Sequence, residues 1–198
     1  MIKEYRTVAG IEDGSFKLRE QRRCLFGCVI MRDFRIAEVK LSWISVDGND
    51  VTEKLLNMLA SSRGVEVLFS GGITFAGFNI LDAKRIFEEA GVPVIIVSKR
   101  RPDNEAVLRA LKKHFEDWEQ RWSTIKRVGE VMEVVNIKAE RLYVEVVGMD
   151  IEEAIEVINK WTLWGKRPEP LRVVNLIVKG LSRILEVEDG YTKLRIVA

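Results

Sequence analysis

The hydrophobic pattern changes its period near residue 47, and this change constrains the fold more than any other feature of the sequence. Upstream, apolar residues follow strand patterns in consecutive segments joined by short connections. These segments are residues 5–13, 23–32 and 35–46. Downstream, apolar residues at helical spacing alternate with short apolar runs. Helices are expected over 51–61, 82–90 and 103–121, and strands over 65–69 and 92–97.

A strand meander followed by helix–strand alternation predicts an α/β fold with a mixed sheet. Right-handed crossovers place the fourth strand beside the first and parallel to it. The predicted strand order is therefore 3-2-1-4-5, with helices on both faces. The first, third, fourth and fifth strands then end at one edge of the sheet, which is where ligands bind in open α/β sheets.

The length of 198 residues suits one domain, which we expect to span residues 1–198. Residues 128–198 are expected to form a C-terminal extension packed on it, with a β-hairpin over 130–136 and 141–147, then two helices. A short tail follows Asp189-Gly190. With 47% apolar residues, 31% charged residues and a net charge of +2, the chain is neither disordered nor broadly basic. Only a local patch could therefore bind nucleic acid.

Cysteine and histidine usage narrows the chemistry. Cys24 and Cys28 lie in the second predicted strand, roughly 13 Å apart, which is too far for a disulfide, so free buried thiols are favoured. His114, the single histidine, is interpreted as a solvated helix residue, although a Ser-His-Asp triad would have to use it. No segment is apolar enough to span a bilayer and the start lacks a signal-peptide core, so a soluble, cytoplasmic protein is expected.

Acidic, basic and small residues follow the strands that share the ligand edge. They are Glu12, Asp13, Asp47, Asp50, Ser70, Gly71, Gly72, Ser98, Lys99, Arg100 and Arg101. Carboxylates from separate strands are the oxygen ligands that Mg²⁺ or Mn²⁺ prefers, and nearby Lys and Arg side chains suit phosphates. The alternatives are that the aspartates only make turns or cap helices, and that the arginines pair with the acids in a surface network. Because side chains alternate along a strand, Glu12 and Asp13 are expected to point to opposite faces.

Residues 70–82 form an unusual segment, with three glycines and two phenylalanines between a strand and a helix. Glycines let backbone N–H groups approach an anion closely, which makes residues 70–79 a candidate phosphate-binding loop. The glycine spacing matches no nucleotide-binding fingerprint. The alternative is a compact loop with Phe75 and Phe78 in the core, followed by Asp82 as a helix cap.

Aromatic residues recur at helical spacing among charged residues at Phe115, Trp118 and Trp122. Stacking on nucleic-acid bases is one interpretation, but this spacing favours a stripe in the core. Trp161 and Trp164 are interpreted in the same way, with a homodimer contact as the alternative if the pair is exposed.

Several of these segments together resemble a known family. They are Gly10-Ile11-Glu12-Asp13-Gly14, Asp47-Gly48, residues 71–82, Pro93-Val94-Ile95 and Arg101-Pro102-Asp103. In this combination they resemble the archaeal family called domain of unknown function ninety-nine, over nearly the whole chain. That family is similar to endonuclease V of the ribonuclease-H-like group, which cleaves nucleic acid beside deaminated bases with a divalent metal. The resemblance thus implies a ribonuclease-H-like fold.

The resemblance also implies roles for individual residues. Ala9-Gly10-Ile11-Glu12 resembles the first-strand motif whose acid binds metal, so Glu12 takes the acid position and Asp13 is an extra acid. Glu53 would stand for the helix glutamate of endonuclease V. Ser70-Gly71 occupies the place of an Asp-Gly pair that holds metal, and the Pro-Tyr-Ile-Pro wedge is absent. Asp47 or Asp82 would then replace the lost acid.

These inferences define the candidate site. The expected catalytic residues are Glu12, Asp13, Asp47 and Asp82, of which the first three would bind Mg²⁺ or Mn²⁺. The expected nucleic-acid or phosphate contacts are Ser70, Gly71, Gly72, Asn79, Lys99, Arg100 and Arg101. The leading hypothesis is an endonuclease V-like protein that binds nucleic acid or cleaves its phosphodiesters with a degenerate acidic site. The alternatives are a non-catalytic interaction or assembly module and a binder of small phosphate ligands.

Overall fold

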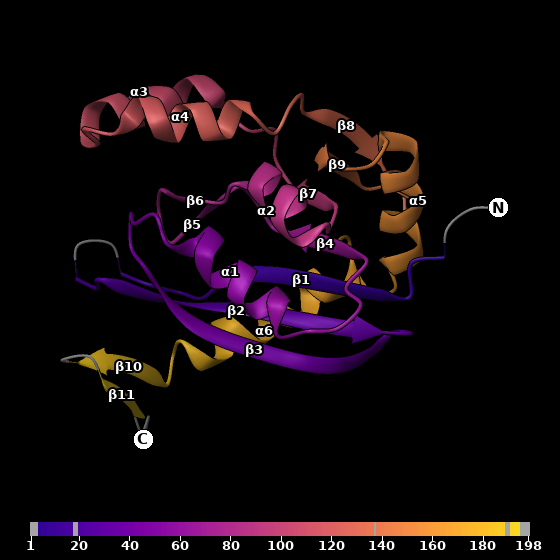
Figure 1. The fold of residues 1–198 in the computed structure, drawn as a ribbon, viewed down its shortest axis with the longest axis horizontal. Coiled ribbons are helices and arrows are strands. Elements are labelled where there is room, and N and C mark those ends of the chain that lie inside the picture. Colours follow the sequence, from indigo (N-terminus) through magenta and orange to yellow (C-terminus); the bar gives the residue numbers. More distant parts are fainter. Residues whose placement is uncertain (1–3, 18–19, 137, 189–190, 195–198) are drawn as a thin grey trace.

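A computed structural model describes residues 4–17, 20–136, 138–188 and 191–194 of the chain. Its centre is a seven-stranded mixed sheet, drawn in Figure 1. In sheet order the strands are β3 (Arg35–Ser45), β2 (Arg23–Arg32), β1 (Thr7–Asp13), β4 (Val67–Ser70), β7 (Val94–Ser98), β9 (Arg141–Val147) and β8 (Met132–Val135). The predicted order 3-2-1-4-5 is confirmed, with β7 as the fifth strand.

Helices cover both faces of this sheet (Figure 1). They are α1 (Val51–Ala60), α2 (Ala83–Ala90), α3 (Asn104–His114), α4 (Trp118–Lys126), α5 (Ile151–Trp161) and α6 (Glu169–Leu181). One core lies between the sheet and α1 and α2, and a second lies between the sheet and α5 and α6. Nearly all of β2 is buried because both of its faces are covered. Together these layers confirm the α/β class.

Two local features, a tight turn and a glycine, shape the central part of the sheet. The β2–β3 hairpin turns at Asp33 and Phe34, whose φ angles of 48° and 64° are those of a tight two-residue turn. Gly10 lies in β1, where an added Cβ would come within 2.5 Å of the Pro170 carbonyl carbon. The missing side chain therefore allows the start of α6 to pack directly on the central strand.

The hairpin of the C-terminal extension is part of the sheet itself. β9 pairs antiparallel with β7, and β8 pairs with β9. The last predicted helix starts earlier and ends earlier than expected, and β10 (Leu185–Glu188) follows it, paired with β11 (Tyr191–Leu194). The Asp189-Gly190 turn lies outside the described residues. The predicted loop after β4 contains a small hairpin, β5 (Thr74–Phe75) and β6 (Asn79–Ile80).

The long helix expected over 103–121 is wrong, because α3 ends at His114 and α4 begins at Trp118. Phe115 adopts extended backbone angles at the break. The chain thereby folds into a helical hairpin whose aromatic residues surround Ile80, Leu111 and Ile125. Tertiary packing of Phe115, Trp118 and Trp122 outweighs the continuous helical pattern, and the expected core stripe is confirmed.

Several single-residue expectations are also confirmed. Cys24 and Cys28 are buried free thiols, and His114 is exposed. Trp161 is fully buried, as expected, whereas Trp164 is 70% exposed, so the core interpretation is wrong for Trp164. In the described part of the chain, no helix is both long and apolar enough to cross a membrane.

Candidate functional site at the carboxyl edge of the sheet

The tip of the central strand carries the two acids that the sequence placed there. Glu12 and Asp13 end β1, and they engage different partners. Neighbouring side chains of β1 also enter different cores, since Val8 lies in the α5–α6 core and Ala9 in the α1–α2 core. The expected alternation of Glu12 and Asp13 therefore holds.

Glu12 is part of a half-hidden ion pair. Its Oε1 accepts a hydrogen bond from Nη1 of Arg167 at 2.8 Å, and the two side chains are 13% and 14% exposed. Burial raises the pKa of Glu12, while the Arg167 guanidinium opposes that rise. Gly71 follows β4 beside this carboxylate, where an added Cβ would collide with it. Gly71 therefore leaves the room that Glu12 occupies.

Asp13 lies between the loop after β4 and the last helix. Its Oδ2 accepts from the backbone N–H of Ala76 at 2.7 Å, and its Oδ1 lies 4.0 Å from Nζ of Lys179. Burial raises the pKa of Asp13, against the lowering effects of the Ala76 N–H and of Lys179. The tip of β1 therefore holds two largely buried carboxylates, each with a nearby cation.

Asp47 braces the same loop from its other side. Its Oδ1 accepts from the N–H of Phe78 at 2.9 Å, and its own N–H donates to the carbonyl of Ala76 at 2.8 Å. Gly77 has a φ of 87°, and a Cβ there would collide with the Asp47 carboxylate. Asp13 and Asp47 therefore fix the two ends of the turn at 76–78.

The polar side chains expected to face phosphate are engaged inside the protein. Asn79 is buried, donates through Nδ2 to Oδ1 of Asp50 at 2.6 Å, and accepts from the N–H of Val51 at 3.1 Å. Ser70 is also buried and donates to the carbonyl of Gly72 at 2.6 Å. The loop is therefore compact, as the alternative interpretation expected, and Phe75 lies in the core.

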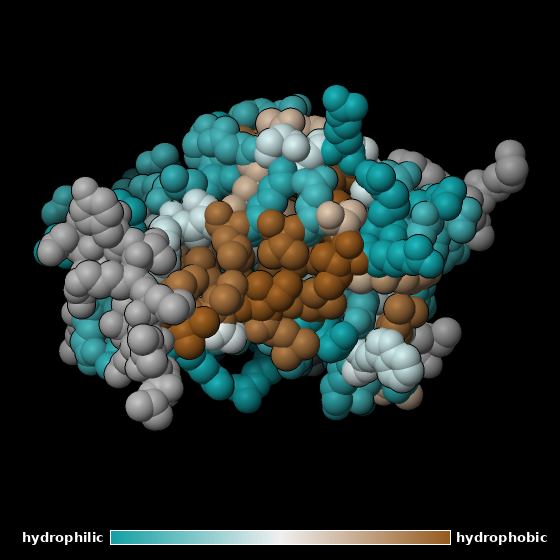
Figure 2. Space-filling model, turned by 90° about the horizontal axis from the view of Figure 1, so that it is seen from below, coloured by the Kyte–Doolittle hydropathy of each residue, from teal (hydrophilic) through white to brown (hydrophobic). Residues whose placement is uncertain are grey.

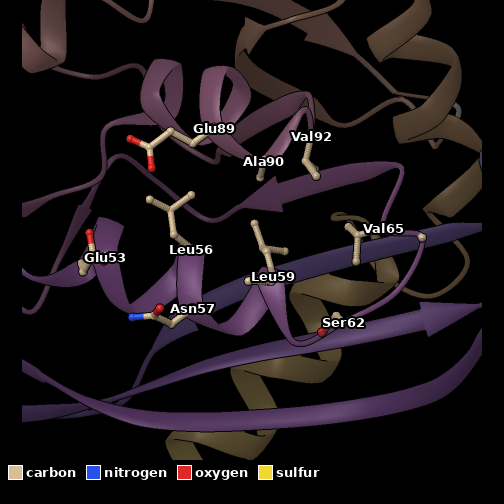
Figure 3. Close-up of a pocket in the computed structure, with 11 residues that line it drawn as sticks. Glu53, Leu56, Asn57, Leu59, Ser62, Val65, Glu89, Ala90 and Val92 are labelled. Atoms are coloured by element: carbon tan, nitrogen blue, oxygen red, sulfur yellow. The ribbon is translucent and has the colours of Figure 1, made fainter.

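Two further acids lie apart from Glu12 and have structural partners. Asp82 caps α2 by accepting from the N–H of Arg85 at 3.0 Å, and its Oδ2 accepts from Arg127 at 2.8 Å. Glu53 pairs with Arg85 at 2.9 Å. Glu53 and Glu89 both line a groove of about 510 Å³ between α1 and α2, shown in Figure 3. Neither Asp82 nor Glu53 therefore joins the acids at the tip of β1.

The three acids expected to bind metal are not assembled around one point. Within the described ranges, no group of three or more His, Cys, Asp or Glu residues is arranged to hold an ion. Strand alternation separates Glu12 from Asp13, and backbone N–H groups take one oxygen each of Asp13 and Asp47. The residues present therefore do not fit a Mg²⁺ or Mn²⁺ site in this conformation.

Cations surround this edge. Lys99, Arg100 and Arg101 follow β7 directly and are exposed. Arg167 and Lys179 contact the acids from the other side, and the sequence analysis missed both. Arg167 lies in the Arg-Pro-Glu-Pro segment at the start of α6, and its contact with Glu12 spans 155 positions of the chain. Lys179 looked like an ordinary charge on a helix, so no local signal could have identified it.

A groove of about 900 Å³ opens beside Asp47. Its lining comes from four separate segments: Gln21, Arg22, Val46, Asp47, Gly77, Phe78, Ala110, His114 and Phe115. The rings of Phe78 and Phe115 meet edge to face at 5.4 Å. Such a volume, with aromatic walls and a few charged groups, falls in the range of small-molecule and nucleotide sites.

The family of the chain follows from a comparison with known proteins. The family model described as Endonuclease dU matches residues 4–182. The chain belongs to the endonuclease dU family. A UPF0215 protein of Pyrococcus furiosus is 37% identical over 187 residues, which cover 92% of this chain and 95% of that protein. The resemblance to an archaeal family, stated from the residues, is thereby confirmed.

Solved structures confirm the fold of this endonuclease dU family member. A protein of unknown function from Archaeoglobus fulgidus superposes with a TM-score of 0.79 at 27% identity, covering 89% of this chain and 98% of that one. Endonuclease V of Ciona intestinalis, in complex with a 24mer DNA that contains an inosine followed by a ribo-adenosine, superposes with a TM-score of 0.61. That match has 12% identity and covers 90% of this chain and 87% of the other, so it shows the endonuclease V-like fold alone.

Proposed function

We propose that this protein is an endonuclease that binds nucleic acid across the carboxyl edge of its sheet and cleaves a phosphodiester bond beside deoxyuridine. The observation that carries the proposal is the pair of buried carboxylates at the tip of β1, each with a cation beside it. The family name supports the reaction and the base. The DNA bound by the Ciona protein supports nucleic acid as the partner of this fold.

The residues of the edge suit phosphodiester hydrolysis. A carboxylate whose pKa is raised by burial accepts a proton from water more readily, and both Glu12 and Asp13 have raised pKa values. Water oxygen would then bond to phosphorus while the bond to the leaving sugar oxygen breaks. Arg167 and Lys179 would offset the charge that develops on the phosphate. Asp13 has the stronger claim as base, because Arg167 already holds Glu12.

The surroundings suit a nucleic-acid strand. Lys99, Arg100 and Arg101 have no hydrogen bond or ion pair within the part of the chain described here, so their charges are available to phosphates. The groove beside Asp47 offers the rings of Phe78 and Phe115 to a base. We expect the deoxyuridine base to enter this groove.

Dependence on Mg²⁺ or Mn²⁺ stays a prediction, and no step is derived through a metal ion, because the acids do not converge. The Glu12–Arg167 pair also favours one alternative, a protein that binds nucleic acid without cutting it. An arginine that occupies a carboxylate oxygen reduces what that carboxylate can do for a metal or for water.

Cleavage of end-labelled oligonucleotides, each with one deoxyuridine, tests the proposal. Single- and double-stranded substrates are compared with matched thymidine substrates, in Mg²⁺, in Mn²⁺ and in chelator. We expect one cut beside deoxyuridine and none in the thymidine substrate. Binding that prefers deoxyuridine without any cut would support the non-catalytic alternative. Equal cleavage and equal binding of the deoxyuridine and thymidine substrates would contradict the assignment of deoxyuridine as the recognised base.

A further inference from the structure

Strand β3 leaves one side unpaired. It lies at the end of the sheet order and pairs with β2 only, among the strands that the structure describes. With bounds at Arg35 and Ser45 it is also a long edge strand. Long unpaired edges present a row of N–H and C=O groups that another strand can bind, and proteins normally cover or interrupt them.

The face of β3 that lies on the α6 side is apolar and exposed. Ile36, Val39 and Leu41 are 52%, 45% and 41% exposed. They pair with Met31, Val29 and Gly27 of β2. These β2 residues lie on the face that packs against α6, whereas the same face of β3 is left exposed. Phe34, in the turn before β3, is 40% exposed, and Leu176 on α6 is 59% exposed. Figure 2 shows this hydrophobic region on the side of the molecule that carries β3 and α6.

We propose that a second copy of this chain binds here, with the two β3 strands pairing antiparallel about a two-fold axis at Leu41. Such an axis is perpendicular to the sheet, so residue pairs across it keep the same face. Leu41 then lies opposite Leu41 of the second copy, and Val39 lies opposite Trp43. The exposed apolar row of one copy thereby meets the apolar row of the other.

The other symmetric registers are less favourable. An axis at Lys40 places two lysines opposite each other, and an axis at Glu38 does the same with two glutamates. An axis at Val39 runs into the irregularity of β3 at Ala37, where the pairing with β2 shifts. An axis at Ser42 places Val39 opposite Ser45. Only the register at Leu41 pairs the regular part of the strand without opposing like charges and with apolar partners for both exposed residues.

Analytical ultracentrifugation over a range of concentrations tests the dimer, with two lysine variants that share one chemistry. Leu41→Lys should give a monomer, because it brings two charges together at the axis. Val135→Lys is the matched control, since Val135 is 58% exposed on β8 at the opposite edge of the sheet. It should leave the dimer intact, and circular dichroism should show both variants folded. A parent that is monomeric at every concentration overturns the proposal, and so does a dimer that survives Leu41→Lys.

Oxidative cross-linking tests the register. Leu41→Cys should form an intermolecular disulfide quickly, because residues directly opposite in an antiparallel pair have Cβ atoms about 5 Å apart. Val39→Cys should cross-link slowly, since each new thiol faces Trp43. The native Cys24 and Cys28 are buried and give the background. A dimer in which Val39→Cys cross-links faster than Leu41→Cys would overturn the Leu41 axis.

Discussion

At the scale of single residues, the account depends on the contact between Glu12 and Arg167. Arg167→Ala leaves a carboxylate that is 13% exposed without its cation. We expect a loss of about 1–3 kcal/mol in the free energy of unfolding at pH 7, measured with urea. The Glu12→Gln/Arg167→Ala double variant should lose less than Arg167→Ala alone, because no unpaired charge remains. A full loss in the double variant would mean that Arg167 acts through some other contact.

Two glycines in contact with different groups give a matched pair of substitutions. A Cβ at position 10 would come within 2.5 Å of the Pro170 backbone, which cannot move without shifting α6. Gly10→Ala should therefore cost about 1–3 kcal/mol of stability, as overpacking does. At Gly71 the colliding group is the movable end of Glu12. Gly71→Ala should unfold at nearly the parent's urea midpoint but cleave more slowly, because the carboxylate is displaced.

If Gly10→Ala and Gly71→Ala reduce the free energy of unfolding equally, then the carboxylate of Glu12 cannot move aside any more easily than the Pro170 backbone. Parent-like cleavage by a folded Gly71→Ala variant would show that the position of this carboxylate does not matter to the reaction.

Glu145 predicts how stability depends on pH. Its side chain on β9 is buried, and burial alone raises its pKa above the ordinary 4.5. The folded state therefore holds this proton more tightly than the unfolded state, and ionisation costs stability as pH rises from about 4.5 through the raised pKa. Glu145→Gln should raise the melting temperature at pH 7, and the gain should vanish below pH 4.5. A rise in melting temperature that is the same at every pH would show that the titration of Glu145 is not its cause.

At the scale of elements, α4 holds the site loops through one arginine. Arg121 is 7% exposed and donates to the carbonyls of Gly48 at 3.0 Å and Phe78 at 2.6 Å. Arg121→Met keeps the aliphatic stem but leaves both carbonyls unpaired, so we expect a loss of about 2 kcal/mol. Hydrogen exchange at residues 76–80 should accelerate as the turn loosens.

The control is Arg109→Met on the neighbouring helix α3, since Arg109 is 69% exposed and pairs with Glu105 at 3.5 Å. It should change stability by less than roughly 0.5 kcal/mol. If Arg121→Met behaves like this control, then the aromatic contacts of α4, and not its arginine, hold the loops.

The elements also show what the sequence could predict. Periodicity predicted the meander, the crossovers and the order of the first five strands, because β2 and β7 are buried on both faces and β3 is not. It could not predict the break at Phe115, since that break follows from packing against Ile80, which is distant in the sequence. At the site, strand alternation predicted that the side chains of Glu12 and Asp13 point to opposite faces of the sheet. The backbone N–H groups of Ala76 and Phe78, which hold Asp13 and Asp47, became visible only in three dimensions.

At the scale of the whole molecule, one sheet serves two surfaces. The carboxyl edge gathers the acids and cations of the proposed active site, while the outer side of β3 offers a surface to a second copy. The groove beside Asp47 begins at Val46, directly after β3 ends, and Leu41 lies further back along the same strand.

The central claim is that the tip of β1 is the place where the phosphodiester is cut. Single-turnover cleavage of a substrate with one deoxyuridine tests it most directly, with Asp13→Asn and Glu12→Gln compared with Glu152→Gln, an exposed carboxylate on α5. The account predicts at least a roughly 100-fold slower cut in both tip variants, as the loss of an acid–base group causes, and a parent-like rate in Glu152→Gln. Parent-like rates in folded Asp13→Asn and Glu12→Gln would contradict it.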